Sequence, residues 1–457
     1  MRELGVVLLS AREATRSRFA IVVALLLAGG AAGLMWGASG DGTAAGRLAA
    51  FLSWGSGLSW VLLSLAAVFL STSFGRAIMD GRVVPLALAP VDRVRLLLAW
   101  WAGVALVLLG LTALAALTLG LLAQAALLLA PTETRPRLER VLSARGVVRS
   151  APPELGAAWE GIAAELERRA RSGTMPEDLP LERARELELE RFRLGQRTVA
   201  PGRTLAWTFA GVEPDPGARE LELRFYFFVQ DPEGRLPPGR GPRGRWAVHP
   251  IGSDGYADLD GTWGGVSGYT VKKHELAIPV EFLEGRTAVM VRYQNLEERP
   301  ITVLFPEQGP ELRFPAGSFG PNLLRAGLVL WARLLFLGAL GVAASALLDP
   351  KLGALVVLFF LAVGSGHEFL LDALRPSYEA FGHTLGPPLR GLLTGVLWAI
   401  PDLSREDLAQ RLAEGERVTP AEVGRALLGD GAGRGGAILL LGAWLFSRRE
   451  LGAVRGG

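Results

Sequence analysis

The sequence offers few side chains that could perform covalent chemistry. It contains no cysteine, which excludes thiolate nucleophiles, thiolate metal sites and disulfide bonds. The residues that could bind a metal or act as acid and base are His249, His274, Asp254, Asp258 and Asp260. The three aspartates lie in SDGYADLDG, which lacks the 12-residue ligand spacing and closing glutamate of a calcium loop, so a plain turn is the favoured interpretation. No GxSxG, HExxH or paired-histidine motif is present, and we expect no catalytic residue, no metal and no enzymatic activity.

Two charged residues lie deep within apolar stretches. Arg333 precedes Leu347 by nearly the same number of positions as Glu368 follows Gly353 in the next apolar stretch. At about 1.5 Å per helical residue, both would lie about 21–23 Å from the same membrane face. Because an unpaired charge at this depth costs about 3 kcal/mol, we predict an ion pair between Arg333 and Glu368. The pair would either clamp two helices together, which we favour, or line a transport path.

The elements that carry these residues have the composition of a membrane protein. Half of the 457 residues are hydrophobic and only 20% are charged, against about a quarter in an average soluble protein. A bilayer core about 30 Å thick requires about 20 apolar residues of helix. The segments that meet this requirement are Phe19–Gly37, Leu48–Ser71, Leu96–Ala130, Ala326–Leu348 and Leu352–Leu371. Leu96–Ala130 is predicted to be one long helix that protrudes from the bilayer.

A sixth span is predicted at the C-terminus. Gly435–Phe446 is strongly apolar but short, and it reaches span length only if Val423–Arg434 continues the helix, with Asp430 and Arg434 paired at i, i+4. The predicted fold is therefore a polytopic α-helical membrane protein with about six transmembrane helices: residues 19–130 hold helices one to three and residues 317–457 hold helices four to six. Residues 1–18 are predicted to form an amphipathic cytoplasmic interface helix.

The basic residues predict the orientation of the spans. They gather before span one, in the connector of residues 73–95, at Lys351 and after span six, whereas the loop after span one has only Arg47. Basic loops face the cytoplasm, so both termini are predicted to be cytoplasmic and residues 131–322 external. Residues 131–322 hold 26 basic and 28 acidic side chains, and the rest of the chain holds 22 and 17. The predicted location is a bacterial plasma (inner) membrane.

The predicted external part has two different sequence patterns. Residues 131–196 have a charged helical pattern, typical of a stalk, and residues 197–316 have short strand-like runs between turns, which favour an inserted β-sandwich. The strand-like runs are Thr204–Phe209, Glu220–Val229, Arg245–His249, His274–Val280, Thr287–Tyr293 and Ile301–Phe305. Residues 387–428 are predicted to be a second external segment, either interfacial or re-entrant, or a surface helix that shields the sandwich.

Several segments resemble the ABC-2 type permeases of ABC transporters. Arg76–Val104 is similar to the cytoplasmic connector of that family, with Pro90 and Arg93 in its Pro-x-x-Arg element. The acidic pair of the family is missing, Asp80 is the nearest acid, and Arg82 replaces a threonine. The ending LLLGAWLFSRREL and residues 315–351 also resemble this family, in the latter case the members with a large external domain between spans three and four.

The resemblance implies the membrane subunit of an ATP-driven exporter, which pairs with a second permease chain, identical or different. A separate cytoplasmic ATPase would dock on the connector. The residues assigned to docking are Arg76, Asp80, Arg82, Pro90, Asp92 and Arg93. The chain itself has no Gly-x-x-x-x-Gly-Lys-Ser/Thr loop, so we expect it to bind no cofactor and the partner to bind ATP. The other expected partner is membrane lipid, and no nucleic acid is expected.

Two alternatives remain open at this point. The connector could be a basic loop that only sets topology, which would require nothing except its arginines. The whole chain could instead be a membrane-anchored receptor or accessory protein whose external sandwich binds a component of the cell envelope. Neither six spans nor a proline-containing charged connector is required for a receptor, which is why the permease is favoured. The sequence does not indicate the transported substrate.

Overall fold

The computed structural model describes residues 2–82, 92–150, 156–172, 181–231, 242–251, 257–262, 274–283, 285–374, 387–404 and 410–448. Residue contacts divide the chain into two compact units. A helical unit is formed by residues 1–144 together with residues 318–457, and a β unit is formed by residues 145–317. The β unit is thus an insertion in the sequence of the helical unit.

The helical unit contains several helices with the length and apolarity that a membrane span requires. Four helical segments qualify alone, and a fifth qualifies if two helices joined by a 65° bend count as one span. The four are α2 (Arg18–Gly37), α3 (Ala44–Ser71) with its continuation α4 (Ser73–Met79), α6 (Arg93–Leu128) and α10 (Phe319–Leu347). The bent pair is α11 (Pro350–Ser365) and α12 (His367–Ala373). These described helices are consistent with an integral membrane protein that carries an additional domain.

The third predicted span is one helix, as its uninterrupted apolar run indicated. Helix α6 has 36 residues, and Asp92 caps its first turn by accepting a hydrogen bond from the Val94 backbone N–H at 3.4 Å. At 1.5 Å per residue this helix is about 54 Å long, well beyond the thickness of a bilayer core.

The C-terminal region is helical from Pro420 to Ser447. It consists of α15 (Pro420–Arg425), a π-helical segment η2 (Ala426–Gly435) and α16 (Gly436–Ser447). The backbone angles at the junctions Arg425 and Gly435 are those of a right-handed helix, so the direction of the chain is preserved there. The predicted ion pair between Asp430 and Arg434 is confirmed. The glycine-rich sequence of η2 suits a segment that departs from α-helical hydrogen bonding.

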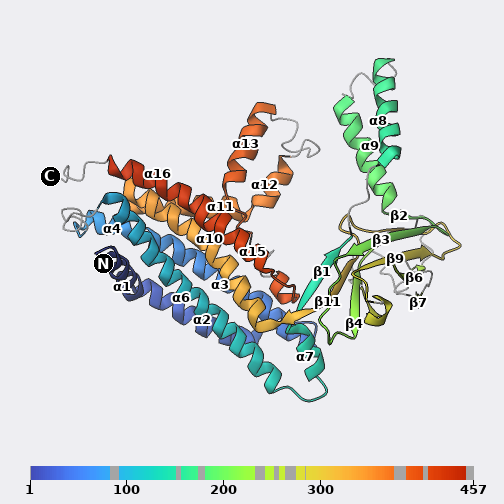
Figure 1. Cartoon of the computed structure of the whole chain (residues 1–457), viewed down its shortest axis with the longest axis horizontal. Coiled ribbons are helices and arrows are strands. Elements are labelled where there is room, and N and C mark those ends of the chain that lie inside the picture. The colour runs from blue at the N-terminus through green and yellow to red at the C-terminus, as the bar shows by residue number, and fades with distance from the viewer. Residues whose placement is uncertain are drawn as a thin grey trace. The chain divides into compact units, whose positions relative to one another are not determined.

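Helix α10 lies at the centre of the helical unit. It packs against α3, α6, α11 and the η2–α16 segment, and Figure 1 shows these helices lying alongside one another. Two indoles connect α10 to α6: Trp101 Nε1 donates to the Leu335 carbonyl oxygen at 3.2 Å, and Trp331 Nε1 donates to the Ala105 carbonyl oxygen at 3.0 Å. Because each helix supplies one donor to the other, the two bonds fix the position of α6 along α10.

The N-terminal helix α1 (Arg2–Arg16) is amphipathic, as predicted, but its small residues are buried rather than its leucines. Ser10 and Ala14 are buried against α6, whereas Leu4 and Leu8 remain 61% and 59% exposed. Helix α1 can approach α6 closely because the α6 residue that faces Ser10 is a glycine, Gly103. The exposed leucines are the face that an interfacial helix would present to lipid.

Replacing Gly103 by leucine should detach α1 from α6. A Cβ atom at this position would lie 1.7 Å from Ser10 Oγ and 2.7 Å from the Val7 carbonyl oxygen. Overpacking of this kind costs about 1–3 kcal/mol, so we expect faster hydrogen exchange in α1 without loss of the other helices. Gly110→Leu is the matched control, because a Cβ at Gly110 meets nothing within 4 Å. Equal exchange in both variants would contradict the packing role of Gly103.

The β unit contains three sheets and a helix pair. The sheet orders are β1-β11-β4-β8, β2-β10-β5 and β3-β9-β6-β7. The strands are β1 (Ser143–Arg149), β2 (Thr198–Val199), β3 (Thr204–Ala210), β4 (Glu220–Phe225), β5 (Phe228–Gln230), β6 (Arg243–Pro250), β7 (Ala257–Thr262), β8 (His274–Pro279), β9 (Ala288–Asn295), β10 (Thr302–Leu304) and β11 (Glu311–Ser318). All the registered pairings, such as β3 with β9 and β4 with β8, are antiparallel. The region predicted as a β-sandwich thus consists of antiparallel strands in three sheets around one apolar core.

Alternation along β4 places its apolar residues in that core. Leu221, Leu223 and Phe225 are each at most 1% exposed, as their spacing indicated. Phe225 lies beside Trp246, with ring centroids 4.5 Å apart, and Trp246 lies 5.0 Å from Tyr293. The chain leaves the sheet after Phe225, so the predicted run Glu220–Val229 is divided between β4 and β5.

Two predictions about this region were wrong in part. The helical stalk contains the helix pair α8 (Gly156–Arg171) and α9 (Leu181–Gln196), and α7 (Arg135–Val141) precedes it, but residues 143–149 form strand β1. Pairing with β11, which is distant in the sequence, decides that conformation. The segment predicted as a plain turn also contains a strand, β7, in which Asp258 and Asp260 lie opposite Ala247 and Arg245 of β6. Asp254 lies outside the described residues.

Candidate functional site

Three of the residues predicted to dock an ATPase, Arg76, Asp80 and Arg82, lie around the start of the connector. Arg82 pairs with Asp80 at 2.5 Å and with Glu13 of α1 at 3.4 Å, and the Arg82 side chain is 61% exposed. Asp80 and Arg82 flank Gly81, whose φ of +72° turns the chain sharply at the end of α4. These three residues, Glu13, Asp80 and Arg82, form an exposed charged cluster that we call the connector triad.

The other predicted docking residues have structural contacts of their own. Asp92 caps α6, and Arg93 Nη1 donates to the carbonyl oxygen of Ser447 at the end of α16, at 3.4 Å. Arg76 Nη2 donates to the Phe69 carbonyl oxygen at 2.9 Å and so bridges the break between α3 and α4. Pro90 lies outside the described residues. Asp92 and Arg93 thus hold the second end of the connector in place, whereas the connector triad is the more exposed part.

The segments rich in basic residues meet at one end of the helical unit. The triad joins α1 to the connector, and Arg93 joins the connector to the end of α16. At the turn between α10 and α11, Pro350 lies under Gly75 of α4, where an added Cβ would be 3.1 Å from Pro350 Cγ. Figure 1 shows α1, α4 and the end of α16 at this same end of the unit. We call this end of the helical unit the basic end.

The predicted ion pair between Arg333 and Glu368 is not formed. Arg333 makes a single hydrogen bond among the described residues, from Nη1 to the Ser404 carbonyl oxygen at 3.5 Å. Glu368 lies beyond Gly366, which ends α11 and begins the 65° bend into α12. The prediction failed because it continued α11 as a straight helix, and the bend redirects the segment that carries Glu368.

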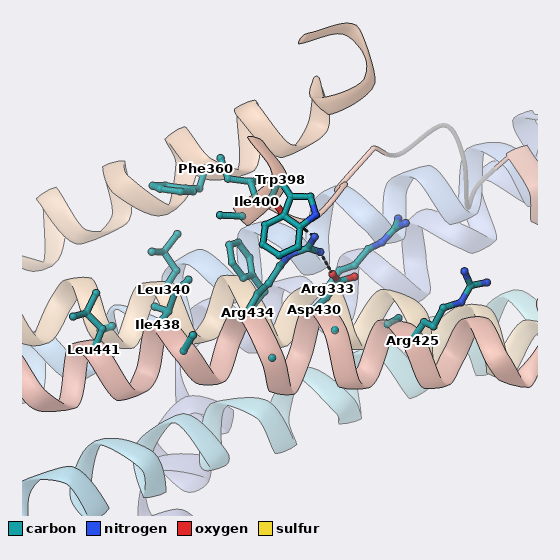
Figure 2. A pocket seen from close by; sticks show the side chains of 18 of the residues that line it. Arg333, Leu340, Phe360, Trp398, Ile400, Arg425, Asp430, Arg434, Ile438 and Leu441 are labelled. Atoms are coloured by element: carbon teal, nitrogen blue, oxygen red, sulfur yellow. Dashed lines mark hydrogen bonds and ion pairs between the residues drawn. The ribbon is translucent and has the colours of Figure 1, made fainter. Parts of the chain in front are cut away.

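Arg333 instead lines a groove in the helical unit. The groove has a volume of about 1180 Å³ and is bounded by α10, α11, α13 (Pro387–Ala399) and the η2–α16 segment. Leu340, Phe360, Ile438 and Leu441 line one half, and arginines and acids line the other half. Figure 2 shows the apolar group on the left, and Arg434, Arg333 and Arg425 from the centre to the right.

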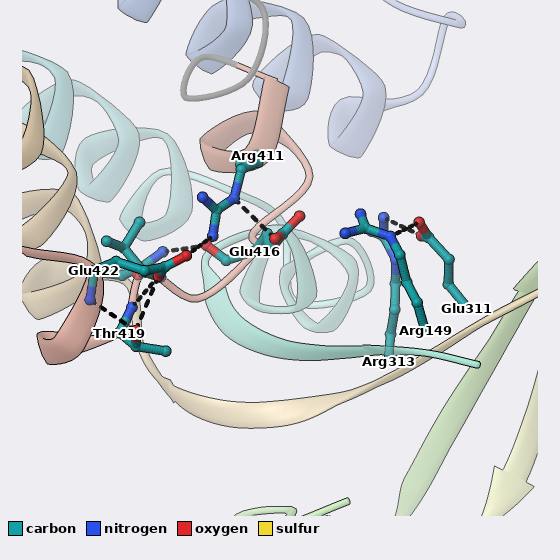
Figure 3. A network of polar contacts seen from close by, with 9 residues as sticks. Arg149, Glu311, Arg313, Arg411, Glu416, Thr419 and Glu422 are labelled. Carbon is teal, nitrogen blue, oxygen red and sulfur yellow. Dashed lines mark hydrogen bonds and ion pairs between the residues drawn. The ribbon is translucent and has the colours of Figure 1, made fainter. Parts of the chain in front are cut away.

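Two ion-pair clusters hold the charged half of the groove. Arg434 pairs with Asp430, donates to the Trp398 carbonyl oxygen at 2.9 Å and lies 5.9 Å from the centroid of the Trp398 ring. Arg411 pairs with Glu416 at 2.8 Å and with Glu422 at 3.0 Å, as Figure 3 shows. Both acids that line the groove, Asp430 and Glu422, are therefore already engaged by an arginine.

The segment after α13 packs on the helical unit. The buried Asn322 of α10 binds it through two hydrogen bonds: its Nδ2 donates to the Glu416 carbonyl oxygen at 2.9 Å, and its Oδ1 accepts from the Val418 N–H at 2.7 Å. Thr419 and Glu422 then form a reciprocal capping box at the start of α15. Residues 416–423 of the predicted external segment are thus fixed to the start of α10.

Sequence reasoning missed this groove. It identified Arg333, Asp430 and Arg434 but assigned the first to a helix clamp and the other two to helix continuity. The four alternate glycines of η2, at 429, 431, 433 and 435, were the available signal, because π-helical segments occur frequently at functional sites. No triad of His, Asp or Glu among the described residues is placed to hold a metal ion, and His274 stacks on Phe225 and Phe227.

No protein-family model matches the chain, and no curated protein matches its sequence. The class of the protein is therefore defined by its structure. Its described part has a helical unit with four or five helices suited to cross a membrane, and an inserted β unit.

Proposed function

We propose that this chain is the membrane-spanning permease subunit of an ATP-driven, ABC-2 type exporter. In this proposal residues 420–447 form a sixth span, both termini face the cytoplasm of a bacterial cell, and the β unit lies outside the inner membrane. ATP is bound and hydrolysed by a separate subunit, and a second permease chain completes the path.

The observation that carries the proposal is the construction of the basic end. An element that transmits motion must be connected rigidly to several spans, and the connector contacts α1 through Arg82 and α16 through Arg93. A loop that only sets topology would require none of these contacts. The exposed triad presents both positive and negative charges to a partner. Complementary charges across an interface contribute more to the choice of partner than to the affinity for it.

Two further features support the six-span reading. The helical continuity from Pro420 to Ser447 exceeds the length of about 20 residues that a bilayer core requires. Helices α10 and η2–α16 also run in the same direction: Gly435 lies against Phe336, and further along both helices Gly442 lies against Ala343. Spans four and six of an alternating topology must run in the same direction.

Mild purification of the full chain from its native membrane should bring a nucleotide-hydrolysing subunit with it. The expected result is ATPase activity that elutes with the chain and is lost when the partner is stripped from it. A chain that repeatedly elutes without such a subunit, together with a soluble envelope component, would favour the receptor alternative.

A further inference from the structure

The groove lined by Arg333 is amphipathic along its length. Because α10 and η2–α16 run in the same direction, residues at matching heights on the two helices face the same part of the groove. Arg333 on α10 and Arg425 and Arg434 on the other segment lie in one half, and Leu340, Ile438 and Leu441 lie in the other. From Arg434 to Leu445 the apolar half extends about 16 Å along the helix.

The arginines that line the groove outnumber its acidic side chains. Asp430 is engaged by Arg434, and Glu422 by Arg411. Arg425 is exposed and makes no hydrogen bond or ion pair within the described part of the chain. Arg333 has only its 3.5 Å contact with the Ser404 carbonyl oxygen, and its Nε is buried without a partner there. Two guanidinium groups are thus available at the charged half.

The chemistry of the two halves specifies the occupant. A guanidinium presents a planar set of donors that matches phosphate oxygens, and in a region of low dielectric a phosphate would stabilise it strongly. The apolar half offers an acyl chain surroundings as apolar as the bilayer core, so the chain loses no hydrophobic free energy when it lies in the groove. Trp398, which is 76% exposed and lies over Arg434, has the amphipathic side chain typical of the boundary between apolar and polar zones of a membrane.

We propose that this groove binds one anionic phospholipid of the surrounding membrane. The headgroup phosphate lies beside Arg333 and Arg425, and an acyl chain lies along Leu340, Ile438 and Leu441. This site is independent of the connector and holds whether or not the chain associates with an ATPase. The bound lipid compensates a charge that would otherwise be left in the interior of the helical unit.

Native mass spectrometry of the full chain in detergent tests the site. The protein is titrated with phosphatidylglycerol and, separately, with phosphatidylcholine of identical acyl chains. We expect one phosphatidylglycerol to remain bound with an affinity at least tenfold higher than that of phosphatidylcholine. Arg333→Gln with Arg425→Gln should reduce this preference to less than twofold, and each single variant should have an intermediate effect.

A matched control removes two arginines of the same unit that do not line the groove. Arg18 and Arg47 are both exposed, so Arg18→Gln with Arg47→Gln changes the net charge equally and should preserve the preference. Thermal unfolding of each variant in the same detergent separates loss of binding from loss of fold. Leu441→Gln, in the apolar half, should weaken both lipids together.

Three outcomes would overturn the proposal. An unchanged preference in the Arg333/Arg425 double variant would place the lipid elsewhere. Equal binding of the two lipids by the native chain would make the groove a site for apolar chains alone. Displacement of phosphatidylglycerol by an equal concentration of glycerol 1-phosphate, which has the headgroup chemistry without acyl chains, would identify a free-anion site.

Discussion

Inverting the connector triad should lower the affinity of the chain for its proposed ATPase subunit about 100-fold. The variant combines Glu13→Arg, Asp80→Arg and Arg82→Asp. It keeps two opposite-charge contacts around position 82 but presents the reverse pattern of charge to a partner. Like charges brought together across an interface cost several kcal/mol, and about 2.8 kcal/mol corresponds to the 100-fold loss expected. Quantitative co-purification or surface binding of the ATPase measures it.

The control for this variant is another exposed ion pair, placed in the β unit. Arg191 pairs with Glu188 at 2.8 Å, and its side chain is 74% exposed. Exchanging the two residues, Glu188→Arg with Arg191→Glu, reverses a surface pair without changing the connector and should leave ATPase binding intact. The triad variant adds positive charge to the basic end, so the positive-inside rule predicts no change of topology. Equal ATPase binding by the triad variant and the native chain would refute docking at the triad.

The structure also explains why the triad is a better test than Asp92 and Arg93. Asp92 caps α6, and loss of a capping residue costs about 1 kcal/mol of helix stability. Arg93 connects the connector to the end of α16. Substitutions at these two positions would change the packing of the basic end as well as its surface, and a loss of binding would have two explanations. The triad lies on the surface, and its inversion keeps opposite charges at positions 13, 80 and 82, so it changes the surface presented to a partner with less change of packing.

Sequence reasoning was most successful where one local property decides the structure. The charge-free run before Ala130 predicted α6 because a segment that apolar has few alternatives to a helix in a membrane protein. Period-two spacing predicted the buried face of β4, and the i, i+4 spacing of Asp430 and Arg434 predicted their pairing. In each case the pattern that decides the structure lies within one short stretch of sequence.

The failures arose where distant segments decide. Residues 143–149 contain Gly146 and two valines, a pattern compatible with a short strand, but only their pairing with β11 makes it one. The bend at Gly366 depends on what packs around it: the Leu403 N–H donates to the Gly364 carbonyl oxygen at 2.9 Å, just before the helix ends. The groove likewise requires the parallel approach of α10 and α16, which no local period reveals.

Replacing Glu311 by glutamine should destabilise the β unit by about 3 kcal/mol at neutral pH, because it removes the carboxylate charge from a largely buried ion pair in which Glu311 accepts hydrogen bonds from two guanidinium groups. Arg313 is only 2% exposed, and its Nη2 donates to Glu311 Oε2 at 3.1 Å, while Arg149 Nε donates to Oε1 at 2.9 Å (Figure 3). Hydrogen exchange of β11 and β4 in the full chain measures the free energy of local opening.

The same carboxylate predicts how the β unit responds to acid. Burial raises the pKa of Glu311, but Arg313 and Arg149 outweigh it, so the pKa is lowered overall. An acid with a lowered pKa contributes stability that is present above its unfolded pKa of about 4.5 and is lost as the pH falls through the folded value. We therefore expect the native β unit to lose protection below about pH 4.5, and Glu311→Gln to show a weaker dependence on pH in that range.

Glu275 of the same sheet is the matched control, because the sign of its pKa shift is opposite. Burial, and then repulsion by Glu222, raise the pKa of Glu275, although Arg224 lies 3.5 Å away. An acid whose pKa is raised by folding contributes stability that is fully present below its unfolded pKa of about 4.5 and is lost as the pH rises through its folded pKa. At neutral pH the ionised Glu275 therefore opposes folding, and Glu275→Gln should stabilise the β unit slightly. If both glutamine variants changed the exchange of β11 in the same direction, the pairing of Glu311 with Arg313 could not be the source of the effect.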